Sequence, residues 1–335
     1  METVILDAKK SDNIKLCADI IKNGGVISFP TETVYGLGAD ALNEKAVDGI
    51  FSIKGRQKDN PLIIHIASLN EINPLIKEIP KTFKPLAEKF WPGPLTLIMK
   101  KSHIVPSNVT AGLDTVAIRI PEHPAALALI RAVGRPVAAP SANPSGRPSP
   151  TKASHVKSDI NGKIQYILDG GDCKLGLEST VLDISDDIPR ILRPGYVTYD
   201  EIKELLNLSK VTNEQKTTEA PKSPGVKYRH YSPKTPLTAV LGAPEKTAEY
   251  ISAHANNQSA ALMFDDYAIS HPNIIRLGHS EDFETQASNL FDALRKADSL
   301  GASAIFAQVP AEDGLGLAVA NRLKKAAGNN IIILY

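Results

Sequence analysis

Three cationic side chains at alternate positions, Lys54, Arg56 and Lys58, mark the stretch of the sequence that is best suited to chemistry. They lie between a predicted helix, residues 44–53, and an apolar run that carries His65. Ammonium and guanidinium groups bind phosphate through charge-assisted hydrogen bonds, which arginine makes in parallel pairs. The stretch therefore predicts an anion site, although a lysine followed by glycine also fits an ordinary helix C-terminus.

A second candidate is an arginine on a predicted strand. In residues 115–120, apolar side chains alternate with Thr115 and Arg119, which share one face of the strand. An arginine in an otherwise apolar neighbourhood requires an anionic partner, either a carboxylate of the protein or a ligand. The spacing alone leaves both alternatives open.

The third candidate is the loop 140–151, in which four prolines lower the entropic cost of ordering the chain. Its hydrogen-bonding side chains are Ser141, Asn143, Ser145, Arg147, Ser149 and Thr151. A proline- and serine-rich linker is the alternative. Strands predicted at 137–139 and 165–168 disfavour it, so we expect a rigid ligand-binding loop.

The elements that must position these groups follow an α/β pattern. Residues 1–29 read as strand, helix and strand, and residues 30–39 as a loop rich in hydroxyl groups and glycine. Ser179 stands at the start of a predicted strand pair, and Arg193 at its end. Further helices are predicted at 83–90, 124–133 and 198–206, and further strands at 95–99, 136–139, 177–183 and 188–192.

Composition bounds the class of protein. A chain of 335 residues predicts about two domains, and a formal net charge of +1 argues against nucleic-acid binding by bulk charge. Cys17 and Cys173 form no metal-binding motif. The N-terminus does not resemble a signal peptide, and no apolar run is long enough to span a membrane. We therefore expect a cytoplasmic protein.

The C-terminal part reads as a second domain behind a linker. Residues 208–236 are poor in apolar side chains, and their second half carries two tyrosines, Lys227, Arg229 and His230 without an acid. That half is either a solvated tether or a segment that docks onto an anionic ligand. Residues 237–335 repeat the α/β pattern, with strands predicted at 237–241, 260–263, 273–277, 304–307 and 330–334, and helices at 244 onward, 283–300 and 316–327.

The polar residues of the first domain form one set that is rich in cations and has no matching set of acids. Such a set predicts a polyanion, most simply a nucleoside triphosphate, whose transferring phosphoryl group is stabilised electrostatically. Because no acidic cluster has metal-ligand spacing, Mg²⁺ would be coordinated mostly by phosphate and water. The set comprises Thr33, Lys54, Arg56, Asn60, His65, Thr115, Arg119, Ser141, Asn143, Ser149, Ser179 and Arg193.

Four motifs also carry a resemblance to a known family. They are residues 25–41 (GVISFPTETVYGLGADA), Lys54-Gly-Arg56 with Asn60-Pro-Leu62, Pro140-Ser-Ala-Asn143, and Ser223-Pro-Gly with His230-Tyr-Ser-Pro233. Together they resemble the YrdC-type threonylcarbamoyl-AMP synthases in their long, two-domain form. The resemblance implies a YrdC-like twisted mixed sheet with helices in residues 1–207. It also implies a linker, 208–236, that folds over the active site, and a smaller Rossmann-like α/β domain in 237–335.

The resemblance further implies a reaction, in which L-threonine, bicarbonate and ATP give threonylcarbamoyl-AMP and pyrophosphate. The product would pass to a downstream threonylcarbamoyl transferase that modifies tRNA, with no membrane involved. Threonine is expected at Thr33, His65, Arg119 and Ser179. ATP is expected at Lys54, Arg56, Asn60, Thr115, Ser141, Ser149, Arg193 and Tyr231. Catalytic roles are expected for Lys54, Arg56, Ser141 and Asn143.

Two other classes compete with this interpretation. The same fold could serve as a module that grips double-stranded RNA by shape, although the near-neutral net charge disfavours it. A carbamoyltransferase of the hydrogenase-maturation type resembles the first domain, but such a protein is expected to carry zinc-finger cysteines that two isolated cysteines do not supply.

Overall fold

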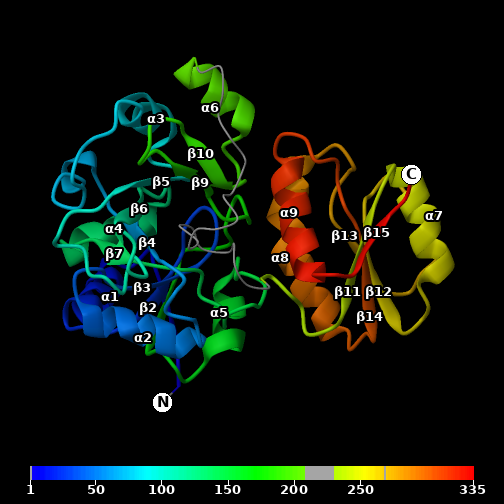
Figure 1. Ribbon diagram of the computed structural model, residues 1–335. Helices are drawn as coiled ribbons and strands as arrows, with labels where there is room; N and C mark the ends of the chain where they lie inside the picture. Colours follow the sequence, from blue (N-terminus) through cyan, green and yellow to red (C-terminus); the bar gives the residue numbers. More distant parts are fainter. Residues whose placement is uncertain (1, 208–229, 268) are drawn as a thin grey trace. The chain divides into compact units, whose positions relative to one another are not determined.

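The structure is a computed structural model that describes residues 2–207, 230–267 and 269–335 (Figure 1). These residues form two compact units. The first contains residues 2–145, 150–174 and 178–207, and the second contains 146–149, 175–177 and the described residues from 230 onward. The second unit thus takes two short segments from the middle of the chain.

The first unit is built on a ten-stranded mixed sheet. It contains both parallel pairs, such as β4 with β6, and antiparallel pairs, such as β5 with β6. In spatial order the strands are β1 (Val4–Asp7), β8 (Tyr166–Asp169), β2 (Ile27–Phe29), β3 (Gly36–Asp40), β7 (Val137–Ala138), β4 (Ile63–His65), β6 (Thr115–Arg119), β5 (Leu95–Lys100), β9 (Thr180–Asp183) and β10 (Arg190–Arg193).

Helices cover both faces of this sheet. One core lies under α1 and α4 and contains Ile27 and Phe29, whereas the other lies under α2, α3, α5 and α6 and contains Leu37. Such a sheet, buried on both faces, explains the almost continuously apolar central strands. The helices are α1 (Ser11–Lys22), α2 (Glu44–Lys54), α3 (Phe83–Phe90), α4 (Pro124–Val133), α5 (Ala153–Ile160) and α6 (Tyr199–Leu206).

The expected loop 30–39 is wrong in its second half, because Gly36–Asp40 forms strand β3, antiparallel to β2. Two glycines within five residues disfavour a strand by propensity. Here they make room for a side chain, since a Cβ on Gly38 would lie 2.7 Å from Cε1 of Phe29. Packing of the Phe29 ring across β3 therefore outweighs the low strand propensity of glycine.

The second unit is a five-stranded parallel sheet with helices, as expected for a Rossmann-like domain. One core of this unit lies under α7 and includes Val240 and Met263. The strands in spatial order are β13 (Ile274–Arg276), β12 (Ser259–Met263), β14 (Ala304–Gln308), β11 (Leu237–Leu241) and β15 (Ile331–Ile333), and the helices are α7 (Pro244–His254), α8 (Phe283–Ser299) and α9 (Gly316–Ala327). The predicted fold class is confirmed.

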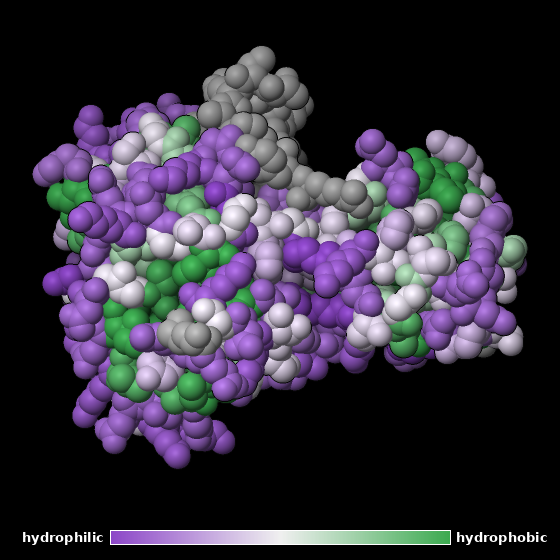
Figure 2. All heavy atoms as spheres, turned by 90° about the horizontal axis from the view of Figure 1, so that it is seen from below, coloured by the Kyte–Doolittle hydropathy of each residue, from purple (hydrophilic) through white to green (hydrophobic). Residues whose placement is uncertain are grey.

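Apolar side chains also reach the surface of the molecule. Figure 2 shows one face, on which hydrophilic residues predominate and apolar residues gather in separate patches. Among the exposed large apolar side chains are Val4 and Ile5 on the edge strand β1, and Ile331 and Ile333 on the edge strand β15. Exposure of single apolar residues is normal for globular proteins.

Candidate active site

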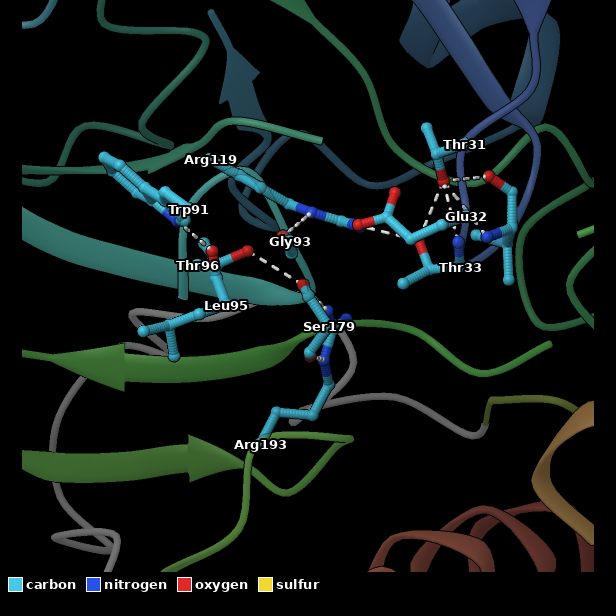
Figure 3. A network of polar contacts seen from close by, with 11 residues as sticks. Thr31, Glu32, Thr33, Trp91, Gly93, Leu95, Thr96, Arg119, Ser179 and Arg193 are labelled. Carbon is cyan, nitrogen blue, oxygen red and sulfur yellow. Dashed lines mark hydrogen bonds and ion pairs between the residues drawn. The ribbon is translucent and has the colours of Figure 1, made fainter. Parts of the chain in front are cut away.

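The guanidinium of Arg119, at the end of β6, is held by three residues from two segments of the chain (Figure 3). Its Nε donates a hydrogen bond to the Gly93 carbonyl at 3.1 Å, and Nη1 donates to Oγ1 of Thr33 at 2.9 Å. Its Nη2 lies 2.7 Å from Oε1 of Glu32. All these side chains are buried, and Arg119 is only 3% exposed, so solvent screens the pair weakly.

The sequence left two alternatives for the anionic partner of Arg119, a protein carboxylate or a ligand. The structure shows a carboxylate of the protein, Glu32. The expectation of cations without matching acids is wrong at this position, because Glu32 balances the guanidinium. Glu32 is also a functional candidate that sequence reasoning missed. The sequence does contain an indication of its role, because Glu32 is the single acid in the loop 30–35 and lies between Thr31 and Thr33.

The loop that carries Glu32 is fixed by local hydrogen bonds. The Oγ1 atom of Thr31 accepts from the backbone N–H groups of Thr33 and Val34, each at 3.2 Å, and donates to the carbonyl of Val34 at 2.7 Å. A threonine that bonds its own backbone in this way defines the turn. The turn therefore presents the side chains of Glu32 and Thr33 to Arg119.

Ser179 and Arg193 form an adjoining network (Figure 3). The Oγ of Ser179 lies 2.8 Å from Oγ1 of Thr96 and accepts from Nη2 of Arg193 at 3.1 Å, and Nε of Arg193 donates to the Ser179 carbonyl at 3.0 Å. The two networks meet at residues 93–95, because the Pro94 carbonyl accepts from the N–H of Thr180. The structure thus brings three predicted site residues, Ser179, Arg193 and Arg119, into one region of the first unit.

Lys54 joins the helix α2 to the proline-rich loop. Gly55 caps the helix in the left-handed conformation, with φ 61°, so the C-terminus predicted for this stretch is present. The ammonium of Lys54 also donates to the carbonyls of Ser141 and Asn143. Burial, and next the charge of Arg56, hold the pKa of Lys54 well below its usual value. An arriving phosphate would favour the charged form of this lysine.

Arg56 and Asn60 belong to a tight connection between α2 and β4. The guanidinium of Arg56 donates to the carbonyls of Asn60 at 3.2 Å and Pro61 at 2.9 Å, and its side chain is half-buried. Lys58 points elsewhere, into an exposed ion pair with Asp48 at 3.0 Å. Of the three cations in this stretch, Lys58 is therefore the surface charge.

His65 and Thr115 lie on the two neighbouring strands β4 and β6. His65 pairs in register with Arg119, and its ring meets Phe29 edge-on at 6.2 Å. Burial, and next the charge of Arg119, lower the pKa of His65 to about 3. Thr115 lies four residues before Arg119, about 13 Å away along the strand. A ligand that reaches both must therefore extend along β6, as a nucleotide with a second substrate would.

The buried state of His65 makes the stability of the protein dependent on pH. The folded protein keeps His65 neutral where the unfolded chain protonates it, so below pH 6.5 the unfolded state binds more protons and acid favours unfolding. We expect this group to lower the free energy of unfolding by about 2 kcal/mol at pH 5 relative to pH 8. Urea unfolding of His65→Gln should show a correspondingly shallower pH dependence. The exposed control His103→Gln should retain the parental slope, and a parental slope in His65→Gln would contradict the prediction.

Two predicted site residues, Ser149 and Tyr231, belong to the second unit. Ser149 is buried. Tyr231 is 4% exposed, has a φ of 65°, and packs its ring 5.3 Å from that of Phe291 and below the guanidinium of Arg322. The earlier part of the predicted linker motif, including Lys227 and Arg229, lies outside the described residues.

The described residues contain neither a metal-binding cluster nor a membrane-spanning helix. No group of three or more His, Cys, Asp or Glu side chains in residues 2–207, 230–267 and 269–335 could hold a metal ion. In the same residues, no helix has the length and apolar character needed to cross a bilayer.

Comparison with known proteins defines the class. Residues 19–195 match the family Sua5/YciO/YrdC, described as "Telomere recombination", and residues 197–328 match the family described as "Threonylcarbamoyl-AMP synthase, C-terminal domain". The first unit also resembles the crystal structure of Escherichia coli YciO, with a TM-score of 0.51 and 25% identity over 57% of this chain and 93% of that chain. The fold is therefore that of a YrdC-type protein, and the C-terminal part of the chain matches a second family.

The full-length relatives are more specific. A threonylcarbamoyl-AMP synthase from Pyrococcus abyssi is 46% identical over 95% of both chains, and one from Bacillus subtilis is 45% identical over 95% of this chain and 94% of its own. The crystal structure of P. abyssi Sua5 complexed with L-threonine superposes with a TM-score of 0.92, covering 99% of this chain and 100% of that chain. The chain belongs to the threonylcarbamoyl-AMP synthase family, in its long two-domain form.

Proposed function

We propose that this protein is an L-threonylcarbamoyladenylate synthase, a nucleotidyltransferase that converts L-threonine, bicarbonate and ATP into threonylcarbamoyl-AMP and pyrophosphate. The observation that carries the proposal is the agreement between site and family. A buried arginine that suits an amino-acid carboxylate and a lysine that suits a phosphate lie in a chain that matches named synthases over nearly its whole length.

The threonine subsite would consist of Thr33, His65, Arg119 and Ser179. Arg119 would receive the threonine carboxylate, since guanidinium and carboxylate match in geometry and charge. Thr33 and Ser179 offer hydroxyl groups beside it. His65 would contribute a neutral imidazole, because its pKa is lowered to about 3. The similar P. abyssi protein forms a complex with L-threonine, which supports a threonine subsite in this chain.

Other residues of the polar set would form the nucleotide subsite. Lys54 and Arg56 would neutralise the phosphates, and the buried Arg193 would add a third cation. The hydroxyl and amide groups, with Tyr231 as its sequence motif predicts, would fix the position of the nucleotide. The full proposed set is Lys54, Arg56, Asn60, Thr115, Ser141, Ser149, Arg193 and Tyr231.

Catalysis would consist of positioning and charge neutralisation. The carbamate formed from threonine and bicarbonate would attack the α-phosphorus of ATP through a carbamate oxygen, and pyrophosphate would leave. Lys54, Arg56, Ser141 and Asn143 would hold the reacting phosphates in place, and the contacts of Lys54 with the 141–143 segment already connect these groups. No residue needs to form a covalent intermediate.

The described residues do not fit a metal held by the protein itself. We propose that Mg²⁺ enters with ATP, on phosphate and water oxygens. The downstream partners would be a threonylcarbamoyl transferase and tRNA. The division into a catalytic domain, 1–207, a linker, 208–236, and a C-terminal domain, 237–335, also stays a proposal. The full-length synthase relatives favour this function over an RNA-binding module.

Pyrophosphate release tests the proposed function. The purified chain is incubated with ATP, threonine and bicarbonate, and each substrate is omitted in turn. We expect release that requires all three substrates and prefers threonine to serine, together with threonylcarbamoyl-AMP detected by mass spectrometry. Release that is indifferent to threonine would remove the substrate assignment, and no release would revive the RNA-binding alternative.

A further inference from the structure

Glu32 is a buried carboxylate to which the proposed function assigns no role. It lies in the turn between β2 and β3 and is 4% exposed. Its Oε1 is 2.7 Å from Nη2 of Arg119, yet neither oxygen of Glu32 accepts a hydrogen bond of normal geometry within the described part of the chain. The Nη2 atom of Arg119 likewise donates none there. The two charges therefore touch while both retain hydrogen-bonding capacity.

This arrangement is costly for a purely structural ion pair. A buried pair is well stabilised when its remaining donors and acceptors are also hydrogen-bonded. Buried polar atoms without such bonds are uncommon in native proteins and require an explanation, for example a group that binds there. The unused donors of Arg119 and acceptors of Glu32 face each other at the place where the threonine carboxylate is proposed to bind.

Two neutral side chains also lie within electrostatic reach of Glu32. They are His123 and Cys173. Burial lowers the pKa of His123 and raises the pKa of the Cys173 thiol, so both are neutral near pH 7. The negative charge of Glu32 is thus directed at Arg119 and at whatever cation binds beside it.

A free amino acid is complementary to such a pair. At neutral pH it carries a carboxylate and an ammonium group on one carbon atom. The guanidinium suits the first, and a carboxylate suits the second. We infer that Glu32 receives the α-ammonium of threonine while Arg119 receives its carboxylate. The inference rests on the proposed function, and it adds a residue that would select the free amino acid.

The same position gives Glu32 a role in forming the carbamate. The nitrogen of threonine attacks carbon only as a neutral amine, so the ammonium must first lose a proton. Glu32 accepts this proton as general base and becomes a carboxylic acid. The amine then forms an N–C bond with the carbon of bicarbonate, and water leaves. In sum, threonine, bicarbonate and the Glu32 carboxylate give the threonine carbamate, water and protonated Glu32, which returns the proton to solvent.

The test compares two ligands that differ only in the ammonium group. Binding of L-threonine and of 2,3-dihydroxybutanoate with the same configuration is measured calorimetrically at pH 7, without ATP or bicarbonate. The parent protein should bind threonine about tenfold to a hundredfold more tightly than the hydroxy acid. In Glu32→Gln this ratio should fall to about threefold or less, through weaker binding of threonine. Glu122→Gln removes a carboxylate from a nearby exposed position and should keep the parental ratio.

The alternative role, in which Glu32 only balances Arg119, gives a different result. Glu32→Gln would then weaken both ligands by the same factor and leave the ratio unchanged, which would overturn the inference. Equal binding of both ligands to the parent protein would overturn it without any variant. Glu32→Asp, which keeps the charge, should retain discrimination if the glutamine variant is unstable. Threonine-dependent pyrophosphate release by the parent protein, together with an unchanged ratio in Glu32→Gln, would refute only the inference. Absence of threonine-dependent release by the parent protein would refute the proposed function.

Discussion

Replacement of Arg119 by glutamine should raise the KM for threonine about a hundredfold, while the KM for ATP stays within about threefold. The guanidinium already contacts Gly93, Thr33 and Glu32, so it is rigidly held before the substrate arrives. Such preorganisation strengthens carboxylate binding because little side-chain entropy is lost. Steady-state pyrophosphate release with one substrate varied at a time measures both constants.

The same substitution should also destabilise the fold. It leaves Glu32 buried without its counter-charge, and breaking a buried pair in this way costs about 3–5 kcal/mol. The double variant Arg119→Gln/Glu32→Gln removes both charges and should recover most of that stability in urea unfolding. It should not recover threonine binding. An equal loss of threonine and ATP affinity in a folded Arg119→Gln protein would refute the threonine assignment of this arginine.

The second large effect is expected at Lys54, where substitution by glutamine should lower kcat/KM for ATP by about 10²–10³-fold. Lys54 is 4% exposed and contacts the carbonyls of Ser141 and Asn143, so its charge acts in a poorly screened environment. An arginine at this position should not restore activity, because the buried ammonium is a point charge and a guanidinium fork requires more space.

Lys58 provides a matched control within the same stretch of chain. Its ion pair with Asp48 is largely exposed to solvent, so Lys58→Gln should change kcat/KM for ATP by less than about twofold. Parallel measurements on the two variants separate a local role from the loss of one positive charge. A similar decrease in both variants would show that Lys54 acts only through the overall charge of this stretch.

Much of the fold was predictable from local patterns. The helices at 83–90, 124–133 and 316–327 have the predicted bounds. Apolar residues recur with helical spacing in them, and α4 in addition has a proline in its first turn and a glycine after its last. The parallel sheet of the second unit followed from alternating strands and helices. These signals are short-range and therefore readable from sequence.

The features that were missed depend on residues far apart in the chain. Strand β3 is stabilised by packing of the Phe29 ring over Gly38. The strand propensities of the residues in β3 do not indicate this contact. The pairing of Glu32 with Arg119 joins two residues that are 87 positions apart in the sequence. The packing of Tyr231 on Phe291 depends on helix α8, and the sequence motif around Tyr231 does not indicate it. Such contacts follow from tertiary structure.

The indole of Trp91 is a natural fluorescent probe of the site. It is the single tryptophan of the chain, it is nearly buried, and its Nε1 donates to the Leu95 carbonyl at 2.6 Å. Gly93, two residues away, accepts the hydrogen bond from Arg119. All tryptophan emission of this protein therefore arises beside the Arg119 network (Figure 3), so an unlabelled sample can report occupancy of that network through its own fluorescence.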